Sequence, residues 1–420
     1  MIRTIFPSLP CGTIAAPASK SHVQRLAAAA MLAHGTTVIH RFSSCDDVDA
    51  ALGIIHALGA HIQRDDTVLT ITSTGFCSPT SDLHCNESGL CARMFAPIAA
   101  LSSTPVVING SGSLQQRSMK SLITALGQCG VTVSHHNDRL PLTITGALRS
   151  PEGVLDASES SQFVTGLLMA LPCVEKDSIV SLENPVSVPY LQLTEEVLCA
   201  FGIGITREES YRYSIPGKQH YRPAEINAEG DWSGAAFPLT AGALCGDVTL
   251  TGLNERSTQA DKKIVEILSK VGARIHQRDD CIRVSANERN AFSCDATDAP
   301  DLFPVLTALA AHCKGVSKIT GVHRLGGKES DRAAVLVKEF GKLGVKITVK
   351  DNSMHITGGT VHGGAIDAHN DHRIAMAGAV LALKAEGAIT ITNAECVSKS
   401  YPRFWEDCER IGIEVENNIF

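Results

Sequence analysis

The sequence predicts an α/β protein of two domains, and three observations support this prediction. The chain has 420 residues, which is too many for a single ordinary hydrophobic core. Helical patterns end six times in a glycine that is followed by alternating apolar residues. Between these glycines, a second helical pattern runs into another short strand pattern. A repeated α/β element of this kind, present six times, divides naturally into two domains of three.

The repeat is nearly regular along the whole chain. Successive helix-ending glycines are 71, 72, 70, 72 and 68 residues apart. Glycine is favoured there because it readily adopts the left-handed conformation that ends many helices. Glycines placed by chance would not recur at the same position of six successive repeats. The six positions are Gly59, Gly130, Gly202, Gly272, Gly344 and Gly412.

Composition and charge exclude several classes of protein. Hydrophobic residues make up 44% and charged residues 19% of the chain, as in ordinary globular proteins. The net charge of −7 argues against a general nucleic-acid or membrane-surface binder. No apolar run reaches membrane-spanning length, and the first residues lack a signal-peptide pattern. We therefore expect a cytoplasmic protein.

The fourteen cysteines form no CxxC pair, so a metal or redox centre is not expected. Several cysteines lie inside helical apolar patterns, where a reduced thiol behaves as a small core residue. The cysteines expected in the core are Cys91, Cys129, Cys199, Cys245, Cys313 and Cys408.

Polar residues recur where the first helix of each repeat is expected to begin. Lys20, Ser21 and Arg25 precede a buried-helix pattern over Leu26–Leu32. Helix N-termini favour anions because their first N–H groups lack helical partners and the macrodipole is positive there. The corresponding residues of the other repeats are Ser88, Gly89 and Arg93; Ser160, Ser161 and Gln162; Asp231 and Ser233; Asp301; and Asp371, His372 and Arg373.

Three repeats packed around a threefold axis would bring three helix N-termini together at one end of each domain. Two such domains facing each other would enclose all six, so the site is expected in the interdomain cleft. Converging helix dipoles are unfavourable unless something anionic lies between them. This arrangement predicts a ligand with several negative charges.

Ten short motifs occur in order along the chain. They are PASKSxxxR from Pro17, SGLCAR from Ser88, QQR ending at Arg117, SSQF from Ser160, VSVPY from Val186, EGDWS from Glu229, PD ending at Asp301, KESDR from Lys328, NDHR from Asn370 and SKSYP from Ser398. Each is weak alone, because a few common residues recur by chance. Together they resemble the 5-enolpyruvylshikimate-3-phosphate synthase (EPSP synthase) group of the enolpyruvyl transferase family, over essentially the whole chain.

The resemblance implies a two-lobed inverted α/β barrel with six βαβαββ repeats, three per domain. One lobe would join residues 1–18 and 229–420 and carry the phosphoenolpyruvate-binding and acid/base residues. The other, residues 19–228, would carry most residues that bind shikimate 3-phosphate. Transfer of a carboxyvinyl group between these substrates, with release of phosphate, would precede chorismate in aromatic amino-acid biosynthesis. The resemblance implies no metal or cofactor, and we expect a monomer that binds neither nucleic acid nor membrane.

The resemblance also implies roles for individual residues. Shikimate 3-phosphate would be bound by Lys20, Ser21, Arg25, Ser160, Ser161, Gln162, Ser187, Asp301 and Lys328. Phosphoenolpyruvate would be bound by Lys20, Gly89, Arg117, Gln162, Arg332, Arg373 and Lys399. Asp301 would accept the proton of the attacking 5-hydroxyl, and Glu329 and Lys20 are rival proton donors to the methylene carbon. The seven cations of this set would face roughly six negative charges on the two substrates.

Simpler interpretations stand beside these roles. Lys399 or Arg117 alone could be a solvated surface cation, and Asp301 could be only a helix cap. Glu329 and Arg332 are three residues apart, as in a helix-surface ion pair, and His372 could be a packed core histidine.

The departures from the family pattern bear on phosphoenolpyruvate affinity and on sensitivity to glyphosate, the family's inhibitor. They are Gln24, Glu87, Ser88 and Arg324.

Two alternative functions remain. The related transferase that acts on UDP-N-acetylglucosamine usually has Lys-Asn in place of Lys20 and Ser21, and a loop cysteine before the arginine that matches Arg117. No cysteine lies between Cys91 and Cys129 in this chain. A non-catalytic, ligand-binding relative would lack the proton-handling residues, which are all present here.

We also expect the lobes to close around shikimate 3-phosphate, because like dipoles repel until an anion bridges them. Small-angle scattering without compaction on adding that substrate would contradict this expectation.

Overall fold

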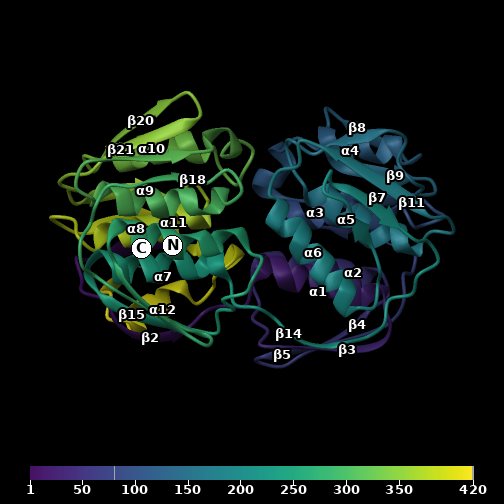
Figure 1. The fold of residues 1–420 in the computed structure, drawn as a ribbon, viewed down its shortest axis with the longest axis horizontal. Helices are drawn as coiled ribbons and strands as arrows, with labels where there is room; N and C mark the ends of the chain where they lie inside the picture. Colours follow the sequence, from purple (N-terminus) through teal and green to yellow (C-terminus); the bar gives the residue numbers. More distant parts are fainter. Residues whose placement is uncertain (80, 419–420) are drawn as a thin grey trace. The chain divides into compact units, whose positions relative to one another are not determined.

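The computed structural model describes residues 1–79 and 81–418, and the chain divides into two compact units (Figure 1). Unit 1 consists of Met1–Ser19 and Glu229–Phe420, and unit 2 is Lys20–Ala228. The first passage between units lies one residue later than the resemblance implied. None of the helices in the described part of the chain combines the length and the apolar character that crossing a membrane requires.

Unit 2 contains three βαβαββ repeats. Its α-helices are α1 (Lys20–Leu32), α2 (Asp46–Ala57), α3 (Gly89–Ala99), α4 (Lys120–Gln128), α5 (Gln162–Ala170) and α6 (Val188–Ala200). Its strands are β3 (His34–His40), β4 (His61–Arg64), β5 (Val68–Thr74), β6 (Leu83–His84), β7 (Val106–Asn109), β8 (Thr132–His136), β9 (Arg139–Thr145), β10 (Val154–Asp156), β11 (Ser178–Glu183), β12 (Thr206–Arg207), β13 (Arg212–Ile215) and β14 (Glu225–Asn227). Short 3₁₀ turns cover Gly112–Gln116 and Leu171–Cys173.

Unit 1 contains the other three repeats. Its α-helices are α7 (Trp232–Cys245), α8 (Ile264–Val271), α9 (Phe303–Ala311), α10 (Arg332–Gly341), α11 (His372–Ala382) and α12 (Phe404–Arg410). Its strands are β1 (Ile2–Ile5), β2 (Cys11–Ala15), β15 (Asp247–Thr251), β16 (Arg274–Arg278), β17 (Cys281–Ser285), β18 (Ser293–Asp295), β19 (Val316–Thr320), β20 (Lys346–Lys350), β21 (Ser353–Thr357), β22 (Gly364–Asp367), β23 (Ile389–Thr392) and β24 (Val415–Asn418). Its 3₁₀ turns are Ala260–Lys263, Pro300–Leu302, Val322–Arg324 and Ala394–Lys399.

The described strands form six four-stranded sheets, one for each repeat. Every sheet joins one parallel pair, such as β10 with β11, to two further antiparallel strands. Three sheets take a strand from a distant part of the chain. β14 pairs with β3, β2 pairs with β15, and β1 lies between β23 and β24. The fold class is therefore as predicted, but these three repeats are not continuous in the sequence.

The six helix-ending glycines all adopt the predicted conformation. Their φ angles lie between 77° and 100°, in the left-handed region. A side chain is strained in this region, so glycine ends these helices at the lowest conformational cost. The second helix of every repeat therefore stops where the sequence pattern indicated.

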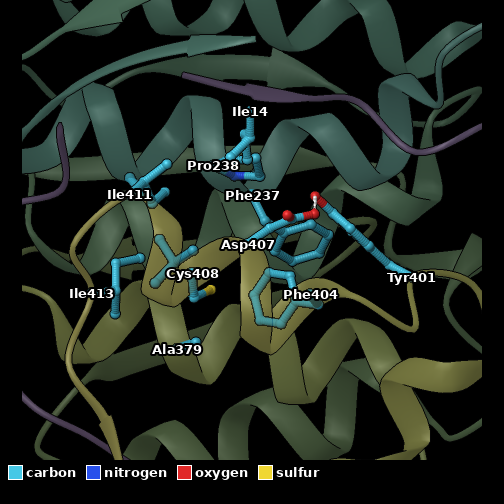
Figure 2. Close-up of a pocket in the computed structure, with 12 residues that line it drawn as sticks. Ile14, Phe237, Pro238, Ala379, Tyr401, Phe404, Asp407, Cys408, Ile411 and Ile413 are labelled. Carbon is cyan, nitrogen blue, oxygen red and sulfur yellow. Dashed lines mark hydrogen bonds between the residues drawn. The ribbon is translucent and has the colours of Figure 1, made fainter. Parts of the chain in front are cut away.

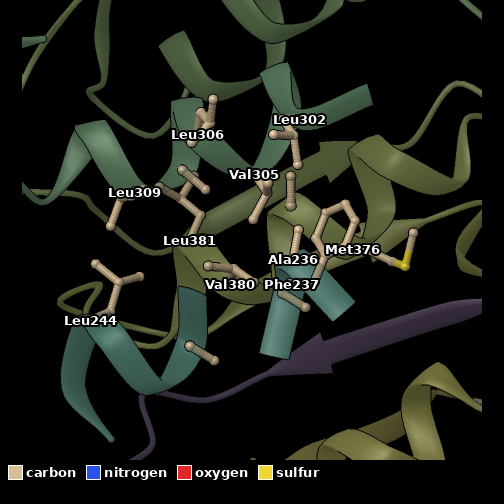
Figure 3. Close-up of a cluster of buried hydrophobic side chains, with 14 of the residues drawn as sticks. Ala236, Phe237, Leu244, Leu302, Val305, Leu306, Leu309, Met376, Val380 and Leu381 are labelled. Carbon is tan, nitrogen blue, oxygen red and sulfur yellow. The ribbon is translucent and has the colours of Figure 1, made fainter. Parts of the chain in front are cut away.

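The core of unit 1 is built from the first helix of each of its repeats. Side chains of α7, α9 and α11 meet in one apolar cluster that includes Phe237, Leu306 and Val380 (Figure 3). Every residue of α9 is buried, and so is every residue of α11. In Figure 1 these helices run through the middle of the unit, with the sheets outside. A helix buried on all sides has little apolar periodicity, because every face packs against other parts of the protein.

No disulfide joins the cysteines of the described chain, but not all six predicted core cysteines are buried. Cys91, Cys129, Cys313 and Cys408 are buried, whereas Cys199 is exposed and Cys245 is half-buried. The core prediction is wrong for Cys199, because the inward face of α6 is formed by Val197 and Leu198 just before it. Cys245 is the last residue of α7, where the helix leaves the core.

Candidate active site

Three helices of unit 2 begin close to one another. The amide nitrogen of Gln24 on α1 donates to the hydroxyl of Ser88, the N-cap of α3, at 3.0 Å. Gln162, the first residue of α5, accepts a hydrogen bond from Arg93 of α3 at 3.3 Å. The starts of α1, α3 and α5 therefore lie together within this unit, as the repeat predicted, and they present N–H groups that favour anions.

Lys20, the first residue of α1, has a carboxylate partner. Its Nζ lies 2.8 Å from Oδ2 of Asp47, which belongs to the first turn of α2. Sequence reasoning missed Asp47, because an acidic residue in the first turn of a helix is common and carries no other signal. The ammonium of Lys20 is therefore fixed in place and partly neutralised.

Arg25 is a buried guanidinium held by neutral oxygens. It is 2% exposed, and its nitrogens donate to the hydroxyls of Thr165 and Thr194 and to the carbonyls of Ser21 and Tyr190, at 2.8 to 3.3 Å. Burial lowers the pKa of Arg25 to about 10, and the nearby Tyr190 raises it by a smaller amount. A buried cation without a carboxylate among its hydrogen-bond partners is well suited to an anionic ligand.

Gly89 lies against two guanidinium groups. A Cβ at this position would lie 2.9 Å from Nη1 of Arg93 and 2.9 Å from Nη1 of Arg117. Arg117 is buried, so it is not the solvated surface cation considered from the sequence. The missing side chain leaves space in front of both cations at the start of α3, where a small anion can approach the backbone.

The serines predicted to bind phosphate lie at the starts of two helices of unit 2, α5 and α6. Ser160 and Ser161 precede α5, and the Ser160 hydroxyl accepts from the backbone N–H of Gln162 at 3.2 Å. Ser187 precedes α6 in the left-handed conformation, with φ of 54°. Since Arg25 donates to residues of both helices, these serines lie at the starts of the helices that hold it.

Unit 1 contains a buried cation surrounded by three carboxylates. Arg332 is 1% exposed. It donates to Asp371 at 2.8 and 3.3 Å, to Asp301 at 2.6 Å and to Glu329 at 2.7 Å. Burial would lower its pKa, but these carboxylates outweigh that effect and raise the pKa well above the ordinary value. The Glu329–Arg332 contact is therefore part of a buried cluster, not the surface pair considered from the sequence.

Arg373 adds a second guanidinium beside the same cluster. It is 3% exposed, and its Nη2 lies 3.1 Å from Oδ2 of Asp301. Its Nε and Nη1 are buried and have no hydrogen-bond partner among the residues that the structure describes. Burial would lower the pKa of Arg373, but Asp301 outweighs this and raises it. Two unsatisfied donors on a buried cation are costly, so an anion bound there would relieve a real penalty.

Asp301 is the point where the cations of unit 1 meet. Besides Arg332 and Arg373, Lys328 Nζ lies 3.6 Å from its Oδ1. Burial lowers the pKa of Lys328 although Asp301 raises it, and burial likewise lowers the pKa of Arg324. Asp301 is 26% exposed and does not cap α9, whose N-cap position is occupied by the next residue. The interpretation of Asp301 as only a helix cap is therefore wrong.

Aspartates cap the starts of α7 and α11. Asp231 accepts from the backbone N–H of Ser233, and Asp371 accepts from that of Arg373, both at 3.0 Å. His372, the first residue of α11, is buried. Asp371 therefore serves two purposes, since it also binds Arg332.

Lys399 is buried and lies on a segment anchored by an aromatic residue. Its Nζ donates to the carbonyl of Asn370 at 2.7 Å, so the surface-cation interpretation is wrong here too. Two residues later, the hydroxyl of Tyr401 donates to Asp407 at 2.9 Å. Figure 2 shows this bond at the edge of a small apolar cavity that Phe237 and Phe404 also line. This packing fixes the segment that carries Lys399.

The structure changes the charge balance derived from the sequence. The seven predicted cations are accompanied by four carboxylates of the protein, which are Asp47, Asp301, Glu329 and Asp371. The sequence counted only substrate charges, because it does not show which acidic residues lie beside which cations. Within the described residues, no group of three or more His, Cys, Asp or Glu side chains is placed to hold a metal ion.

Comparisons with known proteins give a consistent result. The profile of the family described as EPSP synthase (3-phosphoshikimate 1-carboxyvinyltransferase) matches residues 10–408. The 3-phosphoshikimate 1-carboxyvinyltransferase of Clostridium kluyveri is 34% identical over 98% of both chains. That of Thermococcus kodakarensis is 36% identical over 95% of this chain and 97% of its own.

Solved structures agree in fold. EPSP synthase from Acinetobacter baumannii aligns with a TM-score of 0.83 and 26% identity, covering 99% of this chain and 100% of its own. The enolpyruvyl transferase NikO from Streptomyces tendae aligns with a TM-score of 0.81 and 18% identity, over 99% of this chain and 98% of its own. The second likeness concerns the fold alone.

Proposed function

The chain belongs to the EPSP synthase family, and from this membership we propose that it acts as a 3-phosphoshikimate 1-carboxyvinyltransferase. It transfers the carboxyvinyl group of phosphoenolpyruvate to the 5-hydroxyl of shikimate 3-phosphate and releases phosphate. The reaction belongs to the shikimate pathway, which leads to chorismate and the aromatic amino acids. We propose that the enzyme works as a cytoplasmic monomer, without a metal or an organic cofactor.

One observation supports an anionic substrate most directly. The guanidinium of Arg373 is buried, and two of its three nitrogens have no hydrogen-bond partner in the described part of the chain. Both proposed substrates carry a phosphate and a carboxylate, which are the groups that a planar guanidinium binds best. We propose that phosphoenolpyruvate satisfies these two donors.

The proposed substrate contacts follow the two units. Residues of unit 2 hold most of shikimate 3-phosphate, with Arg25 and Ser21 on its carboxylate and Ser160, Ser161 and Ser187 on its phosphate. Lys328 of unit 1 adds to the phosphate contacts. The residues proposed to hold phosphoenolpyruvate are Lys20, Gly89, Arg117, Gln162, Arg332, Arg373 and Lys399. Gln162 and Lys20 are proposed to touch both substrates.

Asp301 is the proposed general base. Its carboxylate is held among Lys328, Arg332 and Arg373, which favour the ionised form that accepts a proton. Protonation of the methylene carbon of phosphoenolpyruvate makes the adjacent carbon electrophilic. The 5-hydroxyl oxygen adds there as its proton passes to Asp301. Loss of phosphate and of one methyl proton then restores the double bond.

Glu329 and Lys20 remain the two candidates for the proton donor. Glu329 accepts from Arg332 at 2.7 Å, and Lys20 donates to Asp47 at 2.8 Å. Rate profiles against pH for Glu329→Gln and Lys20→Met distinguish them, because loss of the donor removes the limb of the profile that it controls. Positioning and charge stabilisation supply most of the remaining rate enhancement.

A phosphate-release assay tests the proposed function. Wild-type protein should release phosphate from phosphoenolpyruvate with shikimate 3-phosphate as acceptor, and not with UDP-N-acetylglucosamine. Asp301→Ala should reduce turnover by about a hundredfold or more, as expected for loss of a general base. Release with the nucleotide sugar alone would support the related transferase. Binding of the substrates without release would support the non-catalytic alternative.

A further inference from the structure

Glu339 of α10 is a buried carboxylate that the proposed chemistry does not use. It has no exposed surface, and its Oε1 accepts from Nε2 of His369 at 2.9 Å. Its Oε2 accepts from the backbone N–H of Asp367 at 2.9 Å and from Lys342 at 2.5 Å. Burial would raise the pKa of Glu339, but these donors outweigh it and lower the pKa to about 2. The carboxylate is therefore ionised at neutral pH and firmly held.

Two of the groups that Glu339 binds, the His369 ring and the backbone N–H of Asp367, belong to the turn formed by residues 367–371, which joins β22 to α11. His369 and Asn370 have φ angles of 50° and 55°, so two consecutive residues with side chains adopt the left-handed conformation. This conformation is unfavourable for such residues and persists only where surrounding contacts impose it. Within the turn, Asp367 Oδ1 accepts from the backbone N–H of His369 at 2.7 Å. From outside the turn, Glu339 accepts from His369 and from the backbone N–H of Asp367. Asn393 also donates to Oδ1 of Asp367 at 2.8 Å, and the carbonyl of Thr392 accepts from the backbone N–H of Ala368 at 3.1 Å.

This turn carries groups of the candidate active site. The carbonyl of Asn370 accepts from Lys399 at 2.7 Å. Asp371 binds Arg332 and caps the helix in which Arg373 is the second residue. A change in the path of the turn therefore moves three of the cations proposed to bind phosphoenolpyruvate, although Glu339 is a hydrogen-bond partner of none of them.

We propose that Glu339, acting through His369, is a positioning residue for phosphoenolpyruvate, because it fixes the turn to which the cations are attached. The inference rests on the proposed function. The inference also gives α10 a second role. The helix begins with Arg332, which binds Asp301, Glu329 and Asp371, and about two helical turns later it carries Glu339, which binds the turn of residues 367–371. One helix therefore contacts both Arg332's carboxylate partners and the turn before α11.

Steady-state kinetics of Glu339→Gln and His369→Ala test this inference. Each variant should raise the KM for phosphoenolpyruvate by about tenfold, the size of effect expected from small displacements of binding groups. The KM for shikimate 3-phosphate should stay within about twofold of wild type, since unit 2 holds most of that substrate. The increase in the double variant should be smaller than the two single increases would give independently, because both substitutions affect the His369–Glu339 contact.

Lys342→Met is the matched control. It removes another donor to the same carboxylate and leaves the hydrogen bonds of His369 and Asp367 to Glu339 in place, so both KM values should stay unchanged. His369 keeps 30% of its side chain exposed. Because a partly exposed side chain is replaced at little cost in stability, His369→Ala tests the positioning role even if Glu339→Gln does not fold.

Three outcomes separate the possibilities. Wild-type protein without turnover contradicts the proposed function itself. An active wild type with unchanged phosphoenolpyruvate KM in the variants overturns the positioning role alone. Equal increases in both KM values, or a rise in Lys342→Met as large as in His369→Ala, also overturn it, because a general loss of structure would then explain the result.

Discussion

Replacing Arg332 with methionine should destabilise unit 1 severely. Methionine has a similar reach and no charge, so the variant leaves three carboxylates without their shared partner and creates only a small cavity. The loss of stability is largest at Asp371, because its side chain has no exposed surface. Asp301 and Glu329 are 26% and 16% exposed and can be solvated.

The magnitude follows from burial. Removing one partner of a buried ion pair costs roughly 3–5 kcal/mol. The two partly exposed carboxylates add little, because solvated pairs contribute only about 0–1 kcal/mol. We therefore expect a loss of about 4 kcal/mol, most of it at Asp371. For a unit of about 200 residues this corresponds to a fall in melting temperature of about 8–16 °C.

Differential scanning calorimetry and urea unfolding measure this loss. The double variant Arg332→Met with Asp371→Asn should recover about 2 kcal/mol, because asparagine keeps the oxygen that caps α11 but removes the buried charge. A loss below about 1 kcal/mol in the single variant would refute the reasoning. So would a double variant less stable than the single one, since an unpaired charge would then not be the cause.

Three further predictions concern other parts of the chain. Burial lowers the pKa of His312 to about 4, so protons bind the unfolded state first as the pH falls from 6.5 to 4. Unfolding free energy should drop by about 3 kcal/mol across that window, and urea titrations of His312→Gln should show a flatter dependence; parallel curves would contradict this. Gly89→Ala places a Cβ 2.9 Å from a nitrogen of each of two guanidiniums and should raise the KM for phosphoenolpyruvate about tenfold. Gly53→Ala, which meets nothing within 4 Å, is its control, and equal effects of the two would argue against steric displacement. Arg25→Met removes the proposed charged hydrogen bonds to the carboxylate of shikimate 3-phosphate, which are worth about 1.5–3 kcal/mol. The KM for shikimate 3-phosphate should therefore rise between about tenfold and a hundredfold. An unchanged KM would show that Arg25 does not bind this substrate.

Local features of the fold could be predicted from the sequence. The helix-ending glycines, the start of α1 at Lys20 and the caps at Ser88, Asp231 and Asp371 depend on a few neighbouring residues. Such signals are governed by backbone conformation and by orphan N–H groups, which act within one or two turns. The period of the pattern then indicated how many repeats the chain contains.

Long-range pairing could not be predicted in the same way. Nothing in β1, β2 or β14 specifies which sheet each completes, since alternating apolar residues can pair with the strands of any of the sheets equally well. The partners of the cations were missed for a related reason. Asp47 and Glu339 resemble ordinary acidic residues of helices, and only tertiary structure places one beside Lys20 and the other beside the turn at His369.

The strand exchange at the beginning of the chain affects the order in which the protein can form during translation. β1 hydrogen-bonds to β23 and β24, which are synthesised after the whole of unit 2. β2 cannot pair with β15 until that strand is synthesised, which happens after the whole of unit 2. Unit 2 contains all of its own strands and can fold as soon as it leaves the ribosome, whereas the first fifteen residues emerge several hundred residues before their partners. The N-terminal strands are therefore the part of the nascent chain that depends most on protection from aggregation.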